Sequence, residues 1–137
     1  MGIASEARIE RELHGALKGF LSGVVHGGFY KNGERPFNSR EEDAVLSIVS
    51  ASPDQIQKGR ARLNIFIPDV YNEAGLPEPY KDRIEEVSEL SEAIIGVLNG
   101  SFDEYDFKLE RSASVTQCSN IQQHAVTIEI SFKRLTF

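Results

Sequence analysis

Apolar residues recur every three or four positions in two parts of the chain, and this spacing predicts two helices. The first helix is expected over residues 5–21, with Ser5 as its N-cap, and the second over residues 80–99. Their apolar stripes consist of Ile9, Leu13, Leu17 and Leu21 in the first helix, and of Ile84, Val87, Leu90, Ile94 and Leu98 in the second. Charged residues occupy the remaining positions, so each helix is expected to bury one face only.

Three other stretches alternate apolar and polar residues with a period of two, which is typical of strands with one buried face. They span residues 60–71, 105–115 and 124–135. Pro68 cannot donate a ladder hydrogen bond and is expected to end strand pairing in the first of them. Residues 23–30 predict a further short strand, in which Gly27 and Gly28 indicate a bulge or a close backbone approach.

Residues 44–51 are almost all apolar or small, and periodicity alone leaves both a buried strand and a short helix open. Ser39 with Glu42 three residues later would suit a helical capping box. The β-branched residues in this run favour a strand. Between this run and the preceding strand, Asn32-Gly33 predicts a tight turn, because both residues tolerate positive φ.

The predicted elements follow the order α-β-β-β-α-β-β, which indicates an α+β fold. We expect an antiparallel sheet of about five strands with the two helices packed on one face. The chain has 137 residues, no internal repeat and no linker-like segment, so residues 1–137 are expected to form a single domain.

Composition narrows the possible functions. The net charge is −6 at pH 7, and the nearest basic group, Lys58, Arg60 and Arg62, has no basic neighbours, which argues against nucleic-acid binding. The single cysteine cannot form an internal disulfide. No secretory signal and no apolar run of membrane-spanning length is present, so we expect a soluble, intracellular protein without a membrane partner.

The residues that could carry chemistry do not form a recognised motif. The three histidines, His14, His26 and His124, lack the paired spacing of zinc ligands, and Cys118 lies six residues from the nearest of them. We therefore interpret Cys118 as a buried thiol and His124 as a polar residue at a strand end. No nucleophile elbow or phosphate-binding loop is present. The prediction is a protein that is not an enzyme and carries no cofactor or metal.

Two acidic clusters lie where loops meet predicted strands, and in an acidic protein we expect them to be solvated. They are Glu41, Glu42 and Asp43, and Asp103, Glu104 and Asp106. An alternative interpretation is a small hydrolase or ligand-binding domain with a pocket between sheet and helices. In that case Glu42 or Asp43 would act together with His26.

The stretch from Tyr30 to Phe37 combines aromatic residues with arginine around a tight turn, a composition that is enriched at protein interfaces. The competing interpretation is an ordinary hairpin tip with its aromatic side chains folded inward. With the turn-rich loop 69–79, the candidate protein-contact residues are Tyr30, Asn32, Arg35, Pro36, Phe37, Asp69 and Tyr71.

Several segments resemble the tail-completion or tail-terminator proteins of tailed bacteriophages and prophages, and the likeness spans most of residues 20–135. The matching stretches are Phe29-Tyr30, Arg35-Pro36-Phe37-Asn38-Ser39, Glu42-Asp43-Ala44-Val45, Gln55-Ile56-Gln57-Lys58-Gly59, Leu63-Asn64-Ile65-Phe66-Ile67-Pro68-Asp69 and His124-Ala125-Val126-Thr127-Ile128. The resemblance implies two helices with an antiparallel sheet and no enzyme activity or cofactor. It carries over no individual contact residue.

The resemblance also implies a virion structural role. Such a subunit would assemble with its own copies into a ring, expected to be six-fold, at the head-proximal end of the tail. It would end tube growth there and bind the tail-tube and head–neck connector proteins. Its location would be the host cytoplasm during assembly and then the virion tail. A bacterial adaptor domain unrelated to phage is a third hypothesis.

Overall fold

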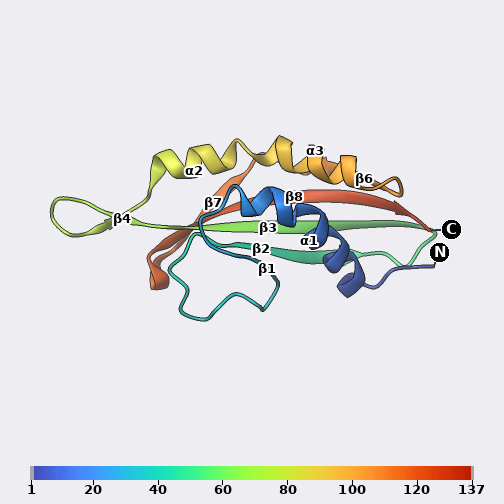
Figure 1. Ribbon diagram of the computed structural model, residues 1–137, viewed down its shortest axis with the longest axis horizontal. Helices are drawn as coiled ribbons and strands as arrows, with labels where there is room; N and C mark the ends of the chain where they lie inside the picture. The colour runs from blue at the N-terminus through green and yellow to red at the C-terminus, as the bar shows by residue number, and fades with distance from the viewer. Residues whose placement is uncertain (1, 137) are drawn as a thin grey trace.

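The computed structural model describes residues 2–136, which form a layer of helices on one face of a twisted sheet (Figure 1). The helices are α1 (Glu6–Ser22), α2 (Lys81–Ser88), α3 (Ser91–Ser101) and the short 3₁₀ turn η1 (Ser119–Ile121). The strands are β1 (Phe29–Lys31), β2 (Ala44–Ala51), β3 (Ile56–Pro68), β4 (Val70–Tyr71), β5 (Pro77–Glu78), β6 (Tyr105–Leu109), β7 (Ser114–Cys118) and β8 (Gln123–Leu135).

Six strands form the main sheet in the order β1-β2-β3-β8-β6, with β7 pairing with the other half of β8. Every pairing is antiparallel except that between β1 and β2. Strands β4 and β5 form a separate hairpin. The predicted α+β class, with helices on one face of a mainly antiparallel sheet, is confirmed.

The sheet is built around β3 and β8, which pair over 13 residues each, from Ile56 opposite Leu135 to Pro68 opposite Gln123. Alternate residues of both strands enter the core, as the period of two predicts. The buried residues of these two strands include Ala61, Leu63, Ile65, Ile67, Val126, Ile128, Ile130 and Phe132. The predicted stripe of α1 packs against them, and Ser5 caps that helix by accepting a hydrogen bond from Arg8 N at 3.1 Å.

Besides the strand expected over 60–71, which begins at Ile56 and ends at Pro68, three expected elements differ in detail from the structure. The helix expected over 80–99 is divided between α2 and α3 at Glu89 and Leu90, and the two pieces lie nearly in line (Figure 1). The strand expected over 105–115 is interrupted, because the four residues 110–113 lie opposite only two residues of β8. This insertion bends the strand in the manner of a large β-bulge. The strand pairing also continues through Cys118, further than expected.

The third difference lies between α1 and β2. Of the expected strand 23–30, only Phe29 and Tyr30 belong to β1, because the N–H groups of Val24 and Val25 bond back to Leu21 O at the end of α1. Gly27 and Gly28 provide the predicted close approach: Gly27 N donates to Glu42 O at 2.9 Å, and Gly28 N donates to Asp43 Oδ1 at 2.8 Å. The tight turn at Asn32-Gly33 is present, with Gly33 at φ +85°, and residues 44–51 form a strand.

Candidate interaction surface

One face of the main sheet is left uncovered by helices, because the buried apolar residues of α1, α2 and α3 belong to the core on the opposite face. The side chains on this open face are those that alternate with the core positions of β3 and β8. They are Lys58, Arg60, Arg62, Asn64 and Phe66 of β3, and Ala125, Thr127, Glu129, Ser131 and Lys133 of β8. Two hollows of about 340 Å³ each lie along this face, one toward each end. The sheet therefore presents a long, mostly polar surface.

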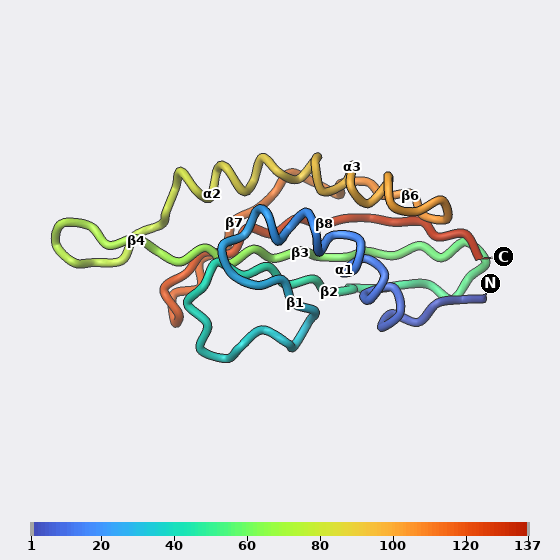
Figure 2. Tube along the Cα trace, in the orientation of Figure 1, coloured from blue at the N-terminus to red at the C-terminus, as the bar shows by residue number. Residues whose placement is uncertain are grey.

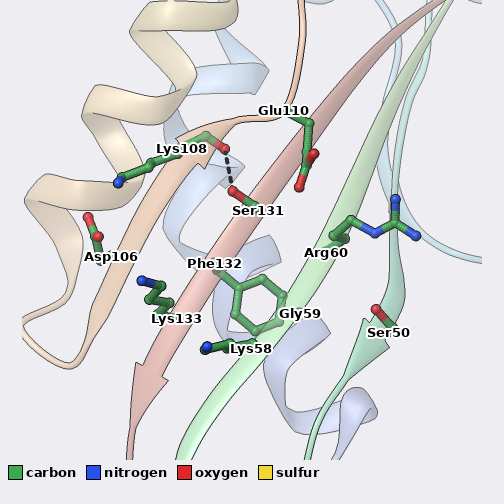
Figure 3. Close-up of a pocket in the computed structure, with 10 residues that line it drawn as sticks. All are labelled: Ser50, Lys58, Gly59, Arg60, Asp106, Lys108, Glu110, Ser131, Phe132 and Lys133. Atoms are coloured by element: carbon green, nitrogen blue, oxygen red, sulfur yellow. Dashed lines mark hydrogen bonds between the residues drawn. The ribbon is translucent and has the colours of Figure 1, made fainter.

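The hollow toward the chain termini is lined mainly by charged side chains, and we call it the basic hollow (Figure 3). It is lined by Ser50, Lys58, Gly59, Arg60, Asp106, Lys108, Glu110, Ser131, Phe132 and Lys133. Strand register brings these residues together from four strands: Lys58 lies opposite Lys133, which in turn lies opposite Asp106. In the next row, Ser131 lies between Arg60 and Lys108.

The basic hollow carries an excess of positive charge in a protein whose net charge is −6. Four cationic side chains line it, against the two carboxylates of Asp106 and Glu110. None of the six takes part in an ion pair within 4.0 Å among residues 2–136. The sequence showed Lys58 and Arg60, but Lys108 and Lys133 join them only through cross-strand register.

In the middle of the open face, two arginines are paired with one shared carboxylate. Glu129 Oε1 lies 3.2 Å from Arg62 Nη2 and 3.1 Å from Arg111 Nη2. Beyond it, Thr127 Oγ1 donates to Asn64 Oδ1 at 2.7 Å in the second hollow. This half of the face is polar but has no excess of unpaired cations. The two halves therefore differ in charge.

At the far end of the face, Arg35 is bound within the protein. Its Nε lies 2.9 Å from Asp43 Oδ2, its Nη2 donates to Gln123 Oε1 at 3.0 Å, and its guanidinium stacks 4.2 Å above the ring of Phe66. Ser39 Oγ also donates to Asp43 Oδ2. Arg35, a candidate contact residue, thus holds the loop 32–41 against the sheet.

The expectation that Glu42 and Asp43 are solvated is wrong. They are 6% and 1% exposed, whereas Glu41 is exposed. Glu42 binds Arg83 of α2 at two points, with Nε to Oε2 at 2.8 Å and Nη2 to Oε1 at 2.5 Å. Sequence patterns did not show this, because the arginine partners lie 8 and 41 residues away. In the second acidic cluster, Asp103 and Asp106 are exposed.

The surroundings of Asp43 and Arg83 shift their titration. Burial raises the pKa of Asp43, but hydrogen bonds from Ser39, Arg35 and Gly28 N–H, with the charge of Arg35, outweigh burial and lower it below its usual value. Hydrogen bonding to Glu42 raises the pKa of Arg83 despite its burial. Asp43 and Arg83 are therefore charged at neutral pH, and each is bound by a side chain of opposite charge.

The histidines and the cysteine are placed separately. His14 stacks on Phe29 with ring centroids 4.1 Å apart, and His26 is exposed. His124 Nδ1 lies 2.7 Å from Asp69 Oδ1 in a pair that is largely buried. Cys118 is half-buried at the end of β7. Among residues 2–136, no three His, Cys, Asp or Glu side chains are grouped in a way that could hold a metal ion.

The remaining candidate contact residues lie on two projecting segments. Phe37, at the outer end of the loop 32–41, is 95% exposed, and Asn32 and Pro36 of this loop are also exposed, while Tyr30 at its start is half-buried. Tyr71 is 59% exposed and belongs to the β4–β5 hairpin, with its hydroxyl donating to Gln122 Oε1 at 2.8 Å. The aromatic side chain of Phe37 therefore does not fold inward.

Comparison with known proteins leaves the family open: no protein-family model and no curated protein matches this sequence. None of the helices within residues 2–136 combines the length and apolar character needed to cross a membrane.

Proposed function

We propose that this chain is a virion structural protein of a tailed phage or prophage, a tail-terminator or tail-completion subunit that forms a ring at the head-proximal end of the tail. The observation that carries the proposal is the open sheet face, which extends along β3 and β8 as far as the loop 32–41, while the helices cover only the other face. The segments that resemble tail-terminator proteins agree with this role.

The open face is large enough for a subunit contact. The strands β3 and β8 have 13 residues each, β2 has 8, and β6 and β7 have 5 each. At about 3.3 Å per residue and about 4.8 Å between strands, they span about 700 Å². This area is close to the roughly 800 Å² that each partner contributes to an interface of standard size. Two different surfaces on one chain, the open sheet face and the helical layer, allow the head-to-tail contacts from which a closed ring is built.

The β4–β5 hairpin supplies a second type of contact surface. It extends from the end of the molecule opposite the chain termini (Figure 2). Asn72 holds its turn by accepting from the N–H groups of Ala74 and Leu76 at 2.9 and 3.0 Å, and Leu76 is 60% exposed. A projecting segment with exposed apolar side chains suits docking to a different protein, here the tail tube or the head–neck connector.

Deletion of the gene from its phage or prophage tests the proposal directly. Without a terminator, tail tubes should grow beyond their normal length and fail to join heads, and electron microscopy of the lysate measures both effects. Light scattering and negative-stain images of the purified protein should show rings, alone or on added tail tubes. Tails of normal length that join heads in the deletion strain would contradict the proposal.

The alternative of a small hydrolase gains no support from the residues on which it depends. The carboxylates of Glu42 and Asp43 are bound by Arg83 and Arg35, and His26 approaches Glu42 only through its backbone N–H at 3.4 Å. None of these three residues lines either hollow of the open face.

A further inference from the structure

We propose that the basic hollow receives the acidic surface of α2 and α3 from a second copy of this chain. This acidic surface consists of Asp82, Glu85, Glu89 and Glu92. The inference rests on the proposed function, which requires self-assembly, and it adds which two surfaces meet. The two patches are opposite in charge and cannot neutralise each other within one copy.

The acidic surface is as free of internal partners as the basic hollow. All four of its carboxylate side chains are exposed, and none forms an ion pair within 4.0 Å among residues 2–136. The neighbouring Arg83 does not neutralise them, because Glu42 and Glu86 already bind its guanidinium. Helical spacing of three or four residues places neighbouring acidic positions on one side of the helices.

The acidic surface also has a hollow of its own. Glu89 and Glu92 line a space of about 400 Å³ at the junction of α2 and α3, together with Leu109 and Ala113 from the edge of the sheet. Lysine side chains projecting from a neighbouring copy could enter it with their apolar stems against Leu109 and Ala113. The two surfaces are therefore complementary in charge.

The position of the two surfaces determines how copies would associate. The basic hollow lies on the open face of the sheet, whereas the acidic surface lies on the helical layer that packs on the other face. A contact between them joins the basic hollow of one copy to the acidic surface of the next. The pair of copies then still has one unpaired basic hollow and one unpaired acidic surface. Such a head-to-tail contact continues until the ring closes.

Charge reversal in both surfaces tests this pairing. One variant carries Lys58→Glu with Lys133→Glu in the basic hollow, and the other carries Glu85→Lys with Glu89→Lys in the acidic surface. The first variant makes both of its surfaces negative, and the second leaves its acidic surface without net charge, so the self-association of each, measured by sedimentation velocity in 50 mM salt, should fall at least tenfold relative to wild type. Exposed charge pairs are screened by salt, so wild-type association should also weaken in 500 mM salt.

An equimolar mixture of the two variants is the decisive sample. The unaltered acidic surface of the first variant then meets the unaltered basic hollow of the second, so pairs of unlike copies should form with an affinity within about threefold of the wild-type contact. Both variants keep a net negative charge, because each double reversal changes the net charge of −6 by only four units. Attraction between oppositely charged whole proteins therefore does not explain recovery.

Matched controls reverse exposed charges elsewhere. Arg11→Glu with Lys18→Glu lies on α1, and Glu6→Lys with Asp54→Lys lies outside both surfaces. These controls should associate as wild type does, and circular dichroism confirms that every variant is folded. A mixture that fails to associate would overturn the inference, as would variants that assemble like wild type. The tail-length experiment tests the proposed function separately, so the two can fail independently.

Discussion

Glu42 and Asp43 are consecutive residues, yet their carboxylates bind arginines on different elements. Glu42 binds Arg83 of α2, in the helical layer, and Asp43 binds Arg35, which stacks on Phe66 of the open face. This division follows from the extended backbone before β2, where successive side chains point to opposite sides. The two carboxylates therefore fasten α2 and the loop 32–41 to the same end of the sheet.

We expect Glu42→Ala to lower the free energy of unfolding by about 3–5 kcal/mol, because it leaves the buried guanidinium of Arg83 without its main counter-charge. Urea unfolding measures the loss. The control Glu85→Ala, at an exposed position of α2, should change the free energy of unfolding by less than about 0.5 kcal/mol. In a double-mutant cycle, Glu42→Ala should lower the free energy of unfolding much less in an Arg83→Met background than in the wild-type protein. Additive losses would show that the pair does not act as a unit.

Asp43 makes stability depend on pH in acid. Because its pKa is lowered in the folded state, the unfolded chain binds a proton more readily once the pH falls toward its unfolded pKa of about 3.9. The stabilisation is therefore complete at neutral pH and is lost as the pH falls below about 4. We expect Asp43→Asn to be less stable than wild type at pH 7, with a difference that narrows toward pH 3. Thermal unfolding across this pH range measures it, and a constant difference would contradict the assignment.

Gly59 lies where the surrounding atoms leave no room for a side chain. A Cβ at this position would meet Ser50 O and the ring of Phe132 at distances too short for contact, since strand register sets Gly59 opposite both Ala51 and Phe132. Gly59→Ala should lower the free energy of unfolding by about 1–3 kcal/mol.

The same substitution at Gly96 is the matched control. Gly96 is exposed within α3, and nothing lies within 4 Å of the position of its Cβ. Gly96→Ala should therefore raise stability by about 0.5–1 kcal/mol, since alanine favours the helix. Equal effects of the two substitutions, measured by urea unfolding, would contradict the packing argument.

Much of the fold followed from periodicity, because α1, β3 and β8 each bury a regular set of apolar positions. The interruptions within the expected elements could not be predicted from periodicity. The bulge at residues 110–113 depends on how the strand pairs with β8, and the separation of α2 from α3 lies within an unbroken apolar stripe. Local patterns also hide Arg134, a fully buried cation whose Nη1 donates to Gln57 Oε1 at 3.2 Å.

The candidate surfaces were predictable only in part, because they join residues far apart in the chain. Asn32-Gly33 marked an exposed turn, and the loop 69–79 contains the projecting hairpin. The basic hollow, by contrast, requires the registers of β3, β6 and β8 to bring Lys58, Lys108 and Lys133 together. A sequence can supply the alternation within each strand but not the offset between strands.

Asn99 protects an edge of the sheet. Its side chain takes the place of a neighbouring strand, accepting from Phe107 N at 2.9 Å and donating to Phe107 O at 3.1 Å. Asn99→Ala should lower the free energy of unfolding by about 1–3 kcal/mol, because the two half-buried backbone groups lose their partners. It should also increase aggregation, which light scattering follows, because an unpaired edge can pair with another chain. Asn120→Ala, at an exposed turn, should change neither property.

Arg35 and Phe37 lie two residues apart in the same loop, but we expect them to have different roles. Arg35 is bound to Asp43 and Gln123, so Arg35→Ala should cost about 2–4 kcal/mol of unfolding free energy through the unpaired carboxylate. Phe37 is 95% exposed, so Phe37→Ser should change stability by less than about 0.5 kcal/mol. If the loop docks on a partner, Phe37→Ser should instead weaken binding to purified tail tubes, measured by co-sedimentation. A variant that binds tail tubes like wild type would remove Phe37 from the contact surface, whereas a loss of stability would show that its ring packs against the fold.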